Sequence, residues 1–451
     1  MKPTRRQMLS GLSAMALAPG CKKVSVDAAD TGLDGPVPAP LRSPEPEKLW
    51  NPDGELATDV FPSGVQVGDA GPSSAVVSVW VNADEVTVLL AKAVEAEWIP
   101  VGDEVTVTRV GASAQCLVEG LDADSAYCVV AFSGTQRSAV SRFRTALGPD
   151  GFRQVTIGAT SCLHSNQPWL NMSHVAATRP DLFMLLGDTV YADSASTVEG
   201  YRAYWSEALN TQGLIDVSGA TSLVATWDDH EVFNDLEGLN APPERVEAAL
   251  TAFREAIPQR QGLDGGIWRK LSWGETADIF VLDGRGERDG AEQYLSDEQM
   301  EWLKSGLEES TARFKLVMNS VPITDFGAIF GEVLMADRWQ GYPKQRGEII
   351  DHIVGNAIEG VLWITGDFHF CTASRIDIPD GPAMDQWEVM VGPGGSTLNF
   401  AANLLEPSEQ FPVIFAEWSS TLIHLDPGTG TVRVEWVGDS GEIWEQFELT
   451  I

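Results

Sequence analysis

Cysteine is scarce in this chain, with five among 451 residues. So few cysteines exclude a fold held together by a disulfide framework. Basic residues are also in deficit, because 30 Lys and Arg stand against 65 Asp and Glu, and the formal net charge is −35. This deficit argues against nucleic acids and anionic membrane surfaces as partners, since both are polyanions. A small anionic substrate is compatible with it, because bound cations can reverse the local field.

The N-terminal segment has no hydrophobic run long enough to span a bilayer. Its apolar stretch, residues 8–18, is short and follows Arg5 and Arg6, as in a twin-arginine export signal. Cys21 follows in a context similar to a lipoprotein cleavage site, so it is either lipidated or a chance cysteine after a plain signal. We predict an export signal over residues 1–21 and a flexible tether over 22–54. The protein would be periplasmic, secreted or lipid-anchored at the cell surface.

Short β-strands are the main pattern of residues 55–147. Residues 75–81 are apolar and β-branched, and residues 105–110 alternate with period 2. Residues 121–127 resemble the fibronectin type III turn that leads into a buried tyrosine. We predict an all-β, immunoglobulin/fibronectin-III-like sandwich with a packing or spacing role. Cys116 and Cys128 flank this turn and form either a disulfide, as suits an exported protein, or two buried free thiols.

From residue 148 to 451 the pattern changes to α/β. Predicted buried strands cover residues 155–161, 181–186, 223–227, 279–282 and 361–365. A capping box at Ser296 and Gln299 predicts the start of one of the helices between them. Ligands of such sheets bind at the carboxyl ends of strands. Here several strands are followed by Cys, Asp or His, which is harder to explain by helix capping alone than by a metal site.

Two side chains in residues 187–193 indicate a metal site. Asp188 follows a predicted strand, and its carboxylate could bridge two cations. Tyr191 lies three residues on, close enough to bind the same metal through its phenol oxygen. A phenolate forms near neutral pH only beside a strongly acidic metal, which favours ferric iron over zinc. The alternative is a turn aspartate with a packed tyrosine.

Three further segments carry metal-competent side chains. Residues 227–235 hold five Asp, Glu or His side chains among apolar ones, and a solvated acidic loop fits this poorly because burying such charge is costly without a cation. Asp367 and His369 are spaced i and i+2 in an extended segment and could face one cavity. Cys162 ends the first strand, either as an apolar core residue or as a thiolate ligand or nucleophile.

Together these motifs resemble the PhoD-like alkaline phosphatase family of the metallophosphoesterase superfamily. The similarity runs from about residue 61 almost to the C-terminus. The segments that carry it are Ser161-Cys162, Gly187-Asp188-Thr189-Val190-Tyr191, Trp227-Asp228-Asp229-His230-Glu231, Leu282-Asp283-Gly284-Arg285 with Arg288, Trp339-Gln340-Gly341-Tyr342-Pro343, and Gly366-Asp367-Phe368-His369. The resemblance implies a four-layer α/β/β/α sandwich, preceded by the β domain, with metals at the strand ends.

The resemblance also implies the metals and their ligands. Ferric iron (Fe³⁺) would be held by Cys162, Asp188, Tyr191 and His369. Asp188 would bridge to a second site that is completed by Asp367 and either Asn234 or Asp229. Calcium (Ca²⁺) is implied at this second site, whose oxygen ligands suit a hard cation. Other divalent metals are compatible with the same set.

Five residues are candidates for contact with the substrate. His230 would stand over the phosphate, where it could stabilise the transition state or protonate the leaving oxygen. Arg285 or Arg288 would meet the charge on the equatorial oxygens. His164 and Asn166 follow the cysteine where the family often carries Gln, so we expect one of them to touch the substrate.

These expectations define a functional hypothesis. The chain is an exported, metal-dependent phosphoric-ester hydrolase, in which a metal-activated hydroxide attacks phosphorus in line with the leaving oxygen. Its substrate would be a small phosphate monoester or diester, and the protein would be a monomer. One alternative is a phosphodiesterase or phospholipase-like activity at the same centre. The other is a surface-tethered binding protein with a structural metal cluster.

Overall fold

The computed structural model describes residues 37–164, 167–290, 292–327 and 337–451. The predicted export signal lies outside these ranges. Within them, every helix is too short or too polar to cross a lipid bilayer. Residues 37–54 belong to the predicted flexible tether, but specific contacts hold them. The Ala39 amide donates to Asp426 at 2.9 Å, and Glu45 pairs with the buried Arg144 at 3.1 Å.

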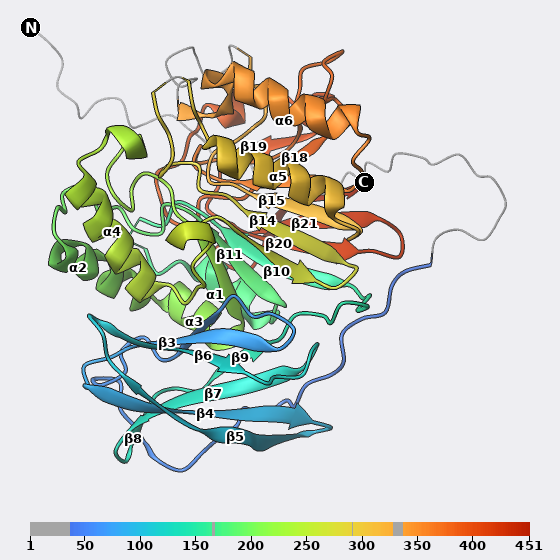
Figure 1. The fold of residues 1–451 in the computed structure, drawn as a ribbon. Helices are drawn as coiled ribbons and strands as arrows, with labels where there is room; N and C mark the ends of the chain where they lie inside the picture. The colour runs from blue at the N-terminus through green and yellow to red at the C-terminus, as the bar shows by residue number, and fades with distance from the viewer. Residues whose placement is uncertain (1–36, 165–166, 291, 328–336) are drawn as a thin grey trace, which may run out of the picture. The chain divides into compact units, whose positions relative to one another are not determined.

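The N-terminal β region consists of two facing layers (Figure 1). One layer contains β1 (Glu55–Leu56), β4 (Glu85–Val94), β5 (Glu97–Thr108), β7 (Ala126–Ser133), β8 (Gln136–Arg137) and β9 (Ser141–Arg144). The other contains β2 (Gln66–Gly68), β3 (Ser74–Trp80) and β6 (Ser113–Glu119). Apolar side chains of both layers, including Val77, Val88 and Val129, form one core. The β-sandwich predicted for this region is therefore present.

The predicted buried tyrosine is Tyr127, which is 2% exposed. Its hydroxyl accepts a hydrogen bond from the Asp122 amide at 2.9 Å and so fixes the turn before β7. Cys116 and Cys128 are free thiols on different layers. Burial raises their pKa values to about 11 and about 12. Of the two alternatives for these cysteines, the structure contains the free thiols.

The sandwich is not separate from the chain that follows. Its layer β2–β3–β6 continues into a nine-stranded sheet of order β22-β21-β20-β10-β11-β12-β2-β3-β6. The junction is the pairing of Gly68 in β2 with Leu223 in β12. A Cβ at Gly68 would lie 1.8 Å from the Pro258 carbonyl oxygen, so only glycine permits this approach. The predicted boundary at residues 147 and 148 thus runs through one continuous sheet.

The remaining strands complete a four-layer arrangement (Figure 1). The nine-stranded sheet adds β10 (Val155–Thr160), β11 (Leu182–Leu186), β12 (Ser222–Thr226), β20 (Ser420–Asp426), β21 (Thr431–Val437) and β22 (Ile443–Thr450). A seven-stranded sheet contains β13 (Arg269–Trp273), β14 (Ala277–Val281), β15 (Phe314–Met318), β16 (Val361–Thr365), β17 (Cys371–Arg375), β18 (Trp387–Met390) and β19 (Val413–Phe415). Apolar residues from both sheets, such as Met184 and Ile364, form the core between them.

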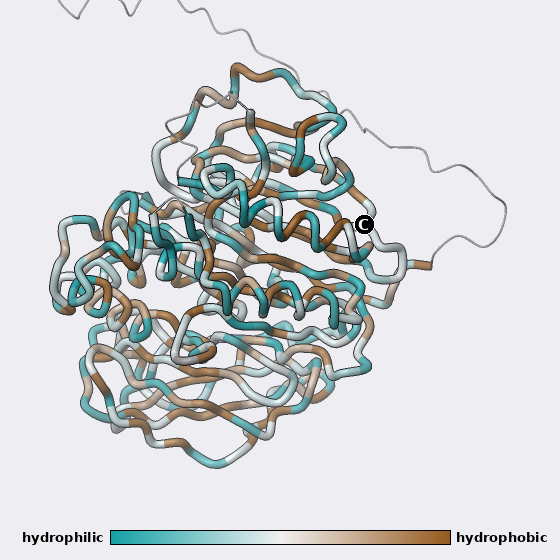
Figure 2. The backbone as a smooth tube through the Cα atoms, turned by 45° about the horizontal axis from the view of Figure 1, so that its top comes forward, coloured by the Kyte–Doolittle hydropathy of each residue, from teal (hydrophilic) through white to brown (hydrophobic). Residues whose placement is uncertain are grey.

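Helices cover the outer faces of both sheets. On the nine-stranded sheet they are α1 (Leu170–Ala177), α2 (Val198–Leu209), α3 (Gln212–Ala220) and α4 (Pro243–Ala256). On the seven-stranded sheet they are α5 (Asp297–Glu309) and α6 (Pro343–Gly355). Their backbones alternate between hydrophilic and hydrophobic residues (Figure 2), as expected when one face is buried. The predicted α/β/β/α sandwich is confirmed.

The predicted cap of α5 is also present, since the Ser296 hydroxyl accepts from the Gln299 amide at 3.1 Å. The Gln299 side chain does not return to the cap. It bonds the backbone of Asp283 instead, at 2.9 and 3.1 Å. This contact ties the helix to the loop that carries Arg285.

In the nine-stranded sheet, β10, β11 and β12 are parallel neighbours, so the segments that follow them meet at one edge.

Candidate metal centre

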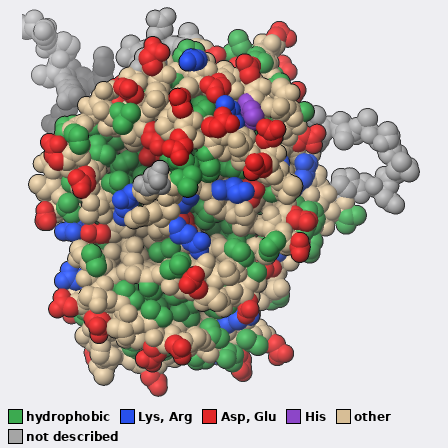
Figure 3. Space-filling model, in the orientation of Figure 1, with side chains coloured by type: hydrophobic (Ala, Val, Ile, Leu, Met, Phe, Trp, Pro, Cys, Tyr) green, Lys and Arg blue, Asp and Glu red, His purple; other side chains and the backbone are tan. Residues whose placement is uncertain are grey.

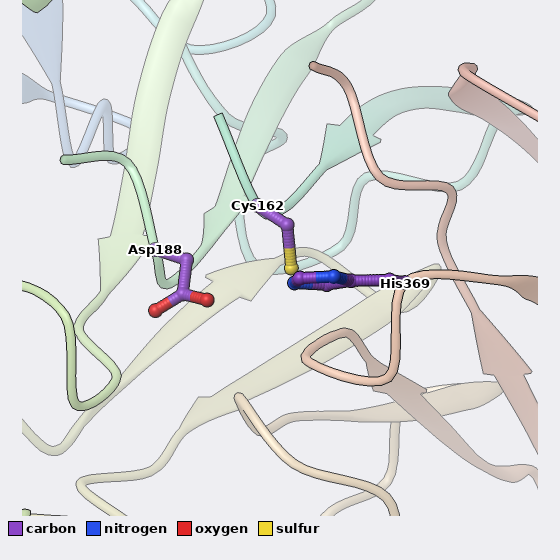
Figure 4. A group of neighbouring side chains, drawn as sticks. All are labelled: Cys162, Asp188 and His369. Atoms are coloured by element: carbon purple, nitrogen blue, oxygen red, sulfur yellow. The ribbon is translucent and has the colours of Figure 1, made fainter. Parts of the chain in front are cut away.

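Three side chains that are far apart in the sequence converge at this edge. The Cys162 sulfur, an Asp188 oxygen and a His369 nitrogen lie within 4.8 Å of one another. In Figure 4 the thiol and the imidazole point toward each other, and the Asp188 carboxylate reaches toward them from a neighbouring loop. Cys162 and Asp188 are almost completely buried. A thiol, an imidazole and a carboxylate together form a donor set for a transition metal.

The backbone at this centre is strained. Cys162, Asp188, Asp367 and His369 all have left-handed φ angles, of 55°, 54°, 70° and 56°. Such a conformation costs about 1–3 kcal/mol for a residue other than glycine and persists only where the surroundings enforce it. Four such residues at one place mark a site that is held in shape against local preference.

Tyr191 joins the same group. Its hydroxyl oxygen lies 3.2 Å from an Asp188 carboxylate oxygen, 3.2 Å from His369 Nε2 and 2.9 Å from the Ser396 hydroxyl. Burial, and then the charge of Asp188, raise the pKa of this phenol well above its usual range. The phenol therefore stays protonated unless a cation is beside it.

Further carboxylates surround Asp188. It forms one close group with Asp229 and His230 and another with Asp228 and Asp367. Burial, followed by neighbouring carboxylates, raises the pKa values of Asp188 and Asp367 well above the usual range. Asp188 Oδ1 is buried, with no hydrogen-bond partner among the described residues. An orphaned carboxylate oxygen within an acidic cluster fits a hard cation.

The two predicted phosphate-binding arginines are buried and paired with carboxylates. Arg285 Nε donates to Asp228 Oδ1 at 2.6 Å, and its guanidinium also binds Asp337. Arg288 donates to Asp337 at 3.1 Å and to the Gly284 carbonyl at 3.1 Å. In this arrangement Arg285 offsets part of the acidic charge of the centre and holds Asp228 in place.

His230 lies at the partly open side of the centre. Its side chain is 17% exposed, and Nδ1 lies 2.8 Å from Asp193 Oδ1. Its ring is 4.2 Å from the Tyr191 ring, centroid to centroid. The His164 ring lies on Tyr191 as well, at 5.2 Å. Asn166 lies outside the described residues.

The two candidates for the remaining ligand of the second metal site differ in burial and in their neighbours. Asp229 is buried and belongs to the close group with Asp188 and His230. Asn234 is exposed, and its amide side chain donates to Asp235 at 2.6 Å.

The loop of residues 391–397 also lies at the site, although its residues were not predicted to belong to it. Thr397 Oγ1 lies 3.2 Å from His369 Nδ1, so Nε2 is left to face Cys162 and Tyr191. Burial lowers the pKa of His369 to about 4, and the nearby His230 adds to this effect, which keeps the imidazole neutral. The Gly395 amide donates to the carbonyl of the strained Cys162 at 3.2 Å. A Gly-Pro-Gly-Gly run after a buried strand was the available signal.

A cavity of about 300 Å³ lies beside the centre. Its lining residues are Asp337, Asp367, Phe368, His369, Thr397, Leu398 and Asn399. Acidic side chains are spread over the molecular face drawn in Figure 3, in keeping with the net charge of −35. One side of the centre thus carries a thiol, an imidazole and a phenol, the other side carries carboxylates, and a cavity adjoins them.

Comparison with known proteins shows the family to which the chain is related. A sequence profile of the PhoD-like phosphatase family matches residues 157–424. Alkaline phosphatase D of Bacillus subtilis strain 168 is 26% identical over an alignment of 331 positions, and the match covers 61% of this chain and 56% of that protein. The match therefore spans little more than half the length of that relative.

Two solved structures share the fold. A structure of PhoD has a TM-score of 0.75 at 22% identity and covers 87% of this chain and 89% of its own. The purple acid phosphatase PPD1 from yellow lupin (Lupinus luteus) seeds has a TM-score of 0.63 at 12% identity, with 86% and 74% covered. Because the family profile matches more than half of its length, the chain belongs to the PhoD-like phosphatase family.

Proposed function

We propose that this chain is a metal-dependent phosphoric-ester hydrolase of the alkaline phosphatase type. The observation that carries the proposal is the convergence on Asp188 of a thiol, two histidines and three further carboxylates. Membership of a phosphatase family supports the reaction class, and one relative is named an alkaline phosphatase. The acidic surface of the chain favours a small substrate over a polyanion.

Two cation sites fit the residues present. Cys162, Asp188, Tyr191 and His369 would hold ferric iron, because a phenol and a thiol ionise readily only beside an acidic metal. Asp188 would bridge to a calcium site that includes Asp367, and the burial of Asp229 favours it over Asn234 as the remaining ligand. Bound cations would supply Lewis acidity and lower the pKa of a water molecule.

The protein side chains orient the substrate and move a proton. Asp193 accepts from His230 Nδ1 and leaves Nε2 to face the substrate. From there His230 can donate a proton to the leaving oxygen or a hydrogen bond to the phosphate. The Tyr191 ring beneath the imidazole limits its movement. Arg285 acts indirectly, since it holds Asp228 and Asp337.

Replacing His230 with glutamine should lower kcat about 100-fold, the usual loss when a general acid is removed. Metal content should not change, because Asp188 and the other proposed ligands are retained. The matched control is His174→Gln on α1, whose ring bonds the Asp439 carbonyl and belongs to none of the close groups of potential ligands in the described structure. Steady-state kinetics with elemental analysis would test this. Equal kcat values for the two variants would exclude a catalytic role for His230.

The cavity beside the centre favours a second activity at the same site. Phe368 and Leu398 give it an apolar portion next to Asp367 and His369. That space could accept the second ester group of a phosphodiester, so we keep phosphodiesterase or phospholipase-like activity as the alternative.

We also propose export, on the basis of Arg5, Arg6 and the short apolar run after them.

Metal analysis of the purified protein tests the proposed function directly. We expect iron near one per chain together with calcium. We also expect hydrolysis of p-nitrophenyl phosphate or of its diester, with the loss of both activities after chelation and their recovery on metal addition. Comparing the two substrates separates a monoesterase from a diesterase. Folded protein that contains no metal and hydrolyses neither substrate, even after metals are added, would contradict the proposal.

A further inference from the structure

Glu231 makes an unusual set of contacts beneath the metal centre. It follows β12 and is 1% exposed. Its Oε2 accepts hydrogen bonds from the amides of Asp188, at 3.0 Å, and Asp228, at 2.9 Å. Its Oε1 accepts from the Thr189 amide at 2.6 Å. One carboxylate thus binds three backbone N–H groups from the two loops that follow neighbouring strands β11 and β12.

These contacts fix the backbone on both sides of Asp188. The amides of Asp188 and Thr189 flank the Asp188 Cα, and both donate to Glu231. The backbone between them has the left-handed φ of 54°. Hydrogen bonds to a buried carboxylate restrain the backbone amides that donate them, because an amide released from its partner would be left buried and unpaired. They can therefore offset the cost of the strained backbone.

The two loops also lie close together at this point. A Cβ on Gly187 would be 2.5 Å from the Asp228 Cβ, so no larger residue fits between them. The Glu231 carboxylate sets the spacing of the loops from below, while Asp188 and Asp228 project into the same close group with Asp367. Both Glu231 oxygens are occupied by backbone amides, so it acts through its neighbours.

We propose that Glu231 is the positioning residue of the metal centre. It holds the Asp188 carboxylate in the orientation that allows one residue to serve both cations, and it keeps Asp228 aligned beside it. This inference rests on the proposed function, because it assumes that Asp188 is a metal ligand. Loss of such a supporting residue typically lowers metal affinity 10- to 100-fold.

Glu388 provides a matched comparison. It is also a completely buried glutamate with three hydrogen-bond donors and no ion pair among the described residues. Its carboxylate accepts from the amides of Ile323 and Thr324 and from the Thr365 hydroxyl. None of these groups belongs to the proposed ligands. A general effect of removing a buried carboxylate would appear equally in Glu231→Gln and Glu388→Gln.

The test uses the full chain after chelator treatment, titrated with Co²⁺ alone. Calorimetry gives the affinity, and the visible absorption spectrum of bound Co²⁺ reports the geometry of its ligands. We expect Glu231→Gln to bind Co²⁺ 10- to 100-fold more weakly than wild type, with an altered spectrum. Glu388→Gln should keep both the wild-type affinity and the wild-type spectrum, whatever its effect on thermal stability.

The possible results are distinct. Wild-type affinity and spectrum in Glu231→Gln, or an equal loss in both variants, would overturn the positioning role. Folded wild-type protein that binds no Co²⁺ would overturn the proposed function, and this inference with it. If circular dichroism shows that Glu231→Gln does not fold, Glu231→Asp replaces it. That variant keeps the charge but is one methylene shorter, and wild-type binding by it would equally overturn the proposal.

Discussion

Replacing Asp188 with asparagine is expected to remove metal binding and hydrolysis together. Asp188 is the one residue common to all three close groups of potential ligands found in the described structure. An amide is uncharged and offers a single acceptor oxygen, so it cannot bridge two cations. We expect kcat/KM to fall by about 1,000-fold or more, equivalent to roughly 4 kcal/mol of transition-state stabilisation.

The same substitution should not destabilise the metal-free protein. In the absence of a cation, burial and neighbouring carboxylates raise the pKa of Asp188, which means that its charge opposes folding. Removing that charge should leave the Tm of the metal-free protein unchanged or raise it. Elemental analysis, kinetics and thermal unfolding with and without chelator would measure the three effects.

A control for this prediction lies at the opposite ends of the strands. Asp181 is buried just before β11, where it accepts from the Thr156 amide at 2.8 Å and pairs with Arg153 at 2.9 Å. Asp181→Asn should show the reverse pattern, with full metal content and a lower Tm. Metal content and activity at wild-type levels in Asp188→Asn would refute the proposed centre.

Replacing Arg285 with methionine should give the largest loss of stability. The substitution leaves the buried Asp228 and the partly buried Asp337 without their main counter-ion. Breaking a buried ion pair in this way costs about 3–5 kcal/mol. Arg285→Lys should lose less, since it keeps the charge but not the planar fork that binds two carboxylates. Urea unfolding of the chelator-treated proteins would measure the stability of both variants. An unchanged unfolding midpoint for Arg285→Met would show that the ion pairs of Arg285 with Asp228 and Asp337 contribute little to stability.

The pH dependence gives a second check on this prediction. Burial alone would raise the pKa of Asp337, but Arg285 and Arg288 hold it below its usual value. A depressed folded-state pKa contributes stability above the unfolded value, near 4, and loses it as the pH falls through the folded value. The stability difference between wild type and Arg285→Met should therefore narrow as the pH falls below about 4.

The strand ends explain why much of the centre could be predicted. β10, β11 and β12 are parallel and adjacent, so the residues that follow them lie close together at one edge of the sheet. This holds however the other strands and helices are arranged. Local patterns marked Cys162 and Asp188 as residues at strand ends, and the family resemblance implied that they share one metal. His369 follows β16 in the seven-stranded sheet. It lies beside Cys162 and Asp188 because the strands of both sheets end on the same side of the molecule, which local patterns do not indicate.

Other parts of the site had no local signal. Ser396 and Thr397 reach Tyr191 and His369 from a loop whose position depends on packing between distant segments. The role of Glu231 depends on backbone amides, which every sequence contains, so residue types could not indicate it. The continuity of the nine-stranded sheet across residues 147 and 148 could not be predicted for a similar reason. It depends on the pairing of β2 with β12, a contact between distant segments that leaves no periodic pattern in the sequence.

That shared sheet has a consequence for how the chain folds. β2 ends at Gly68, but its partner β12 begins only at Ser222, so this pairing must await a strand made much later. Pairings between such distant segments close large loops and are slow to form. Until then one edge of β2 keeps unpaired backbone groups, which invite association with other chains. The rate of forming this junction therefore sets how long a newly made chain is exposed to aggregation.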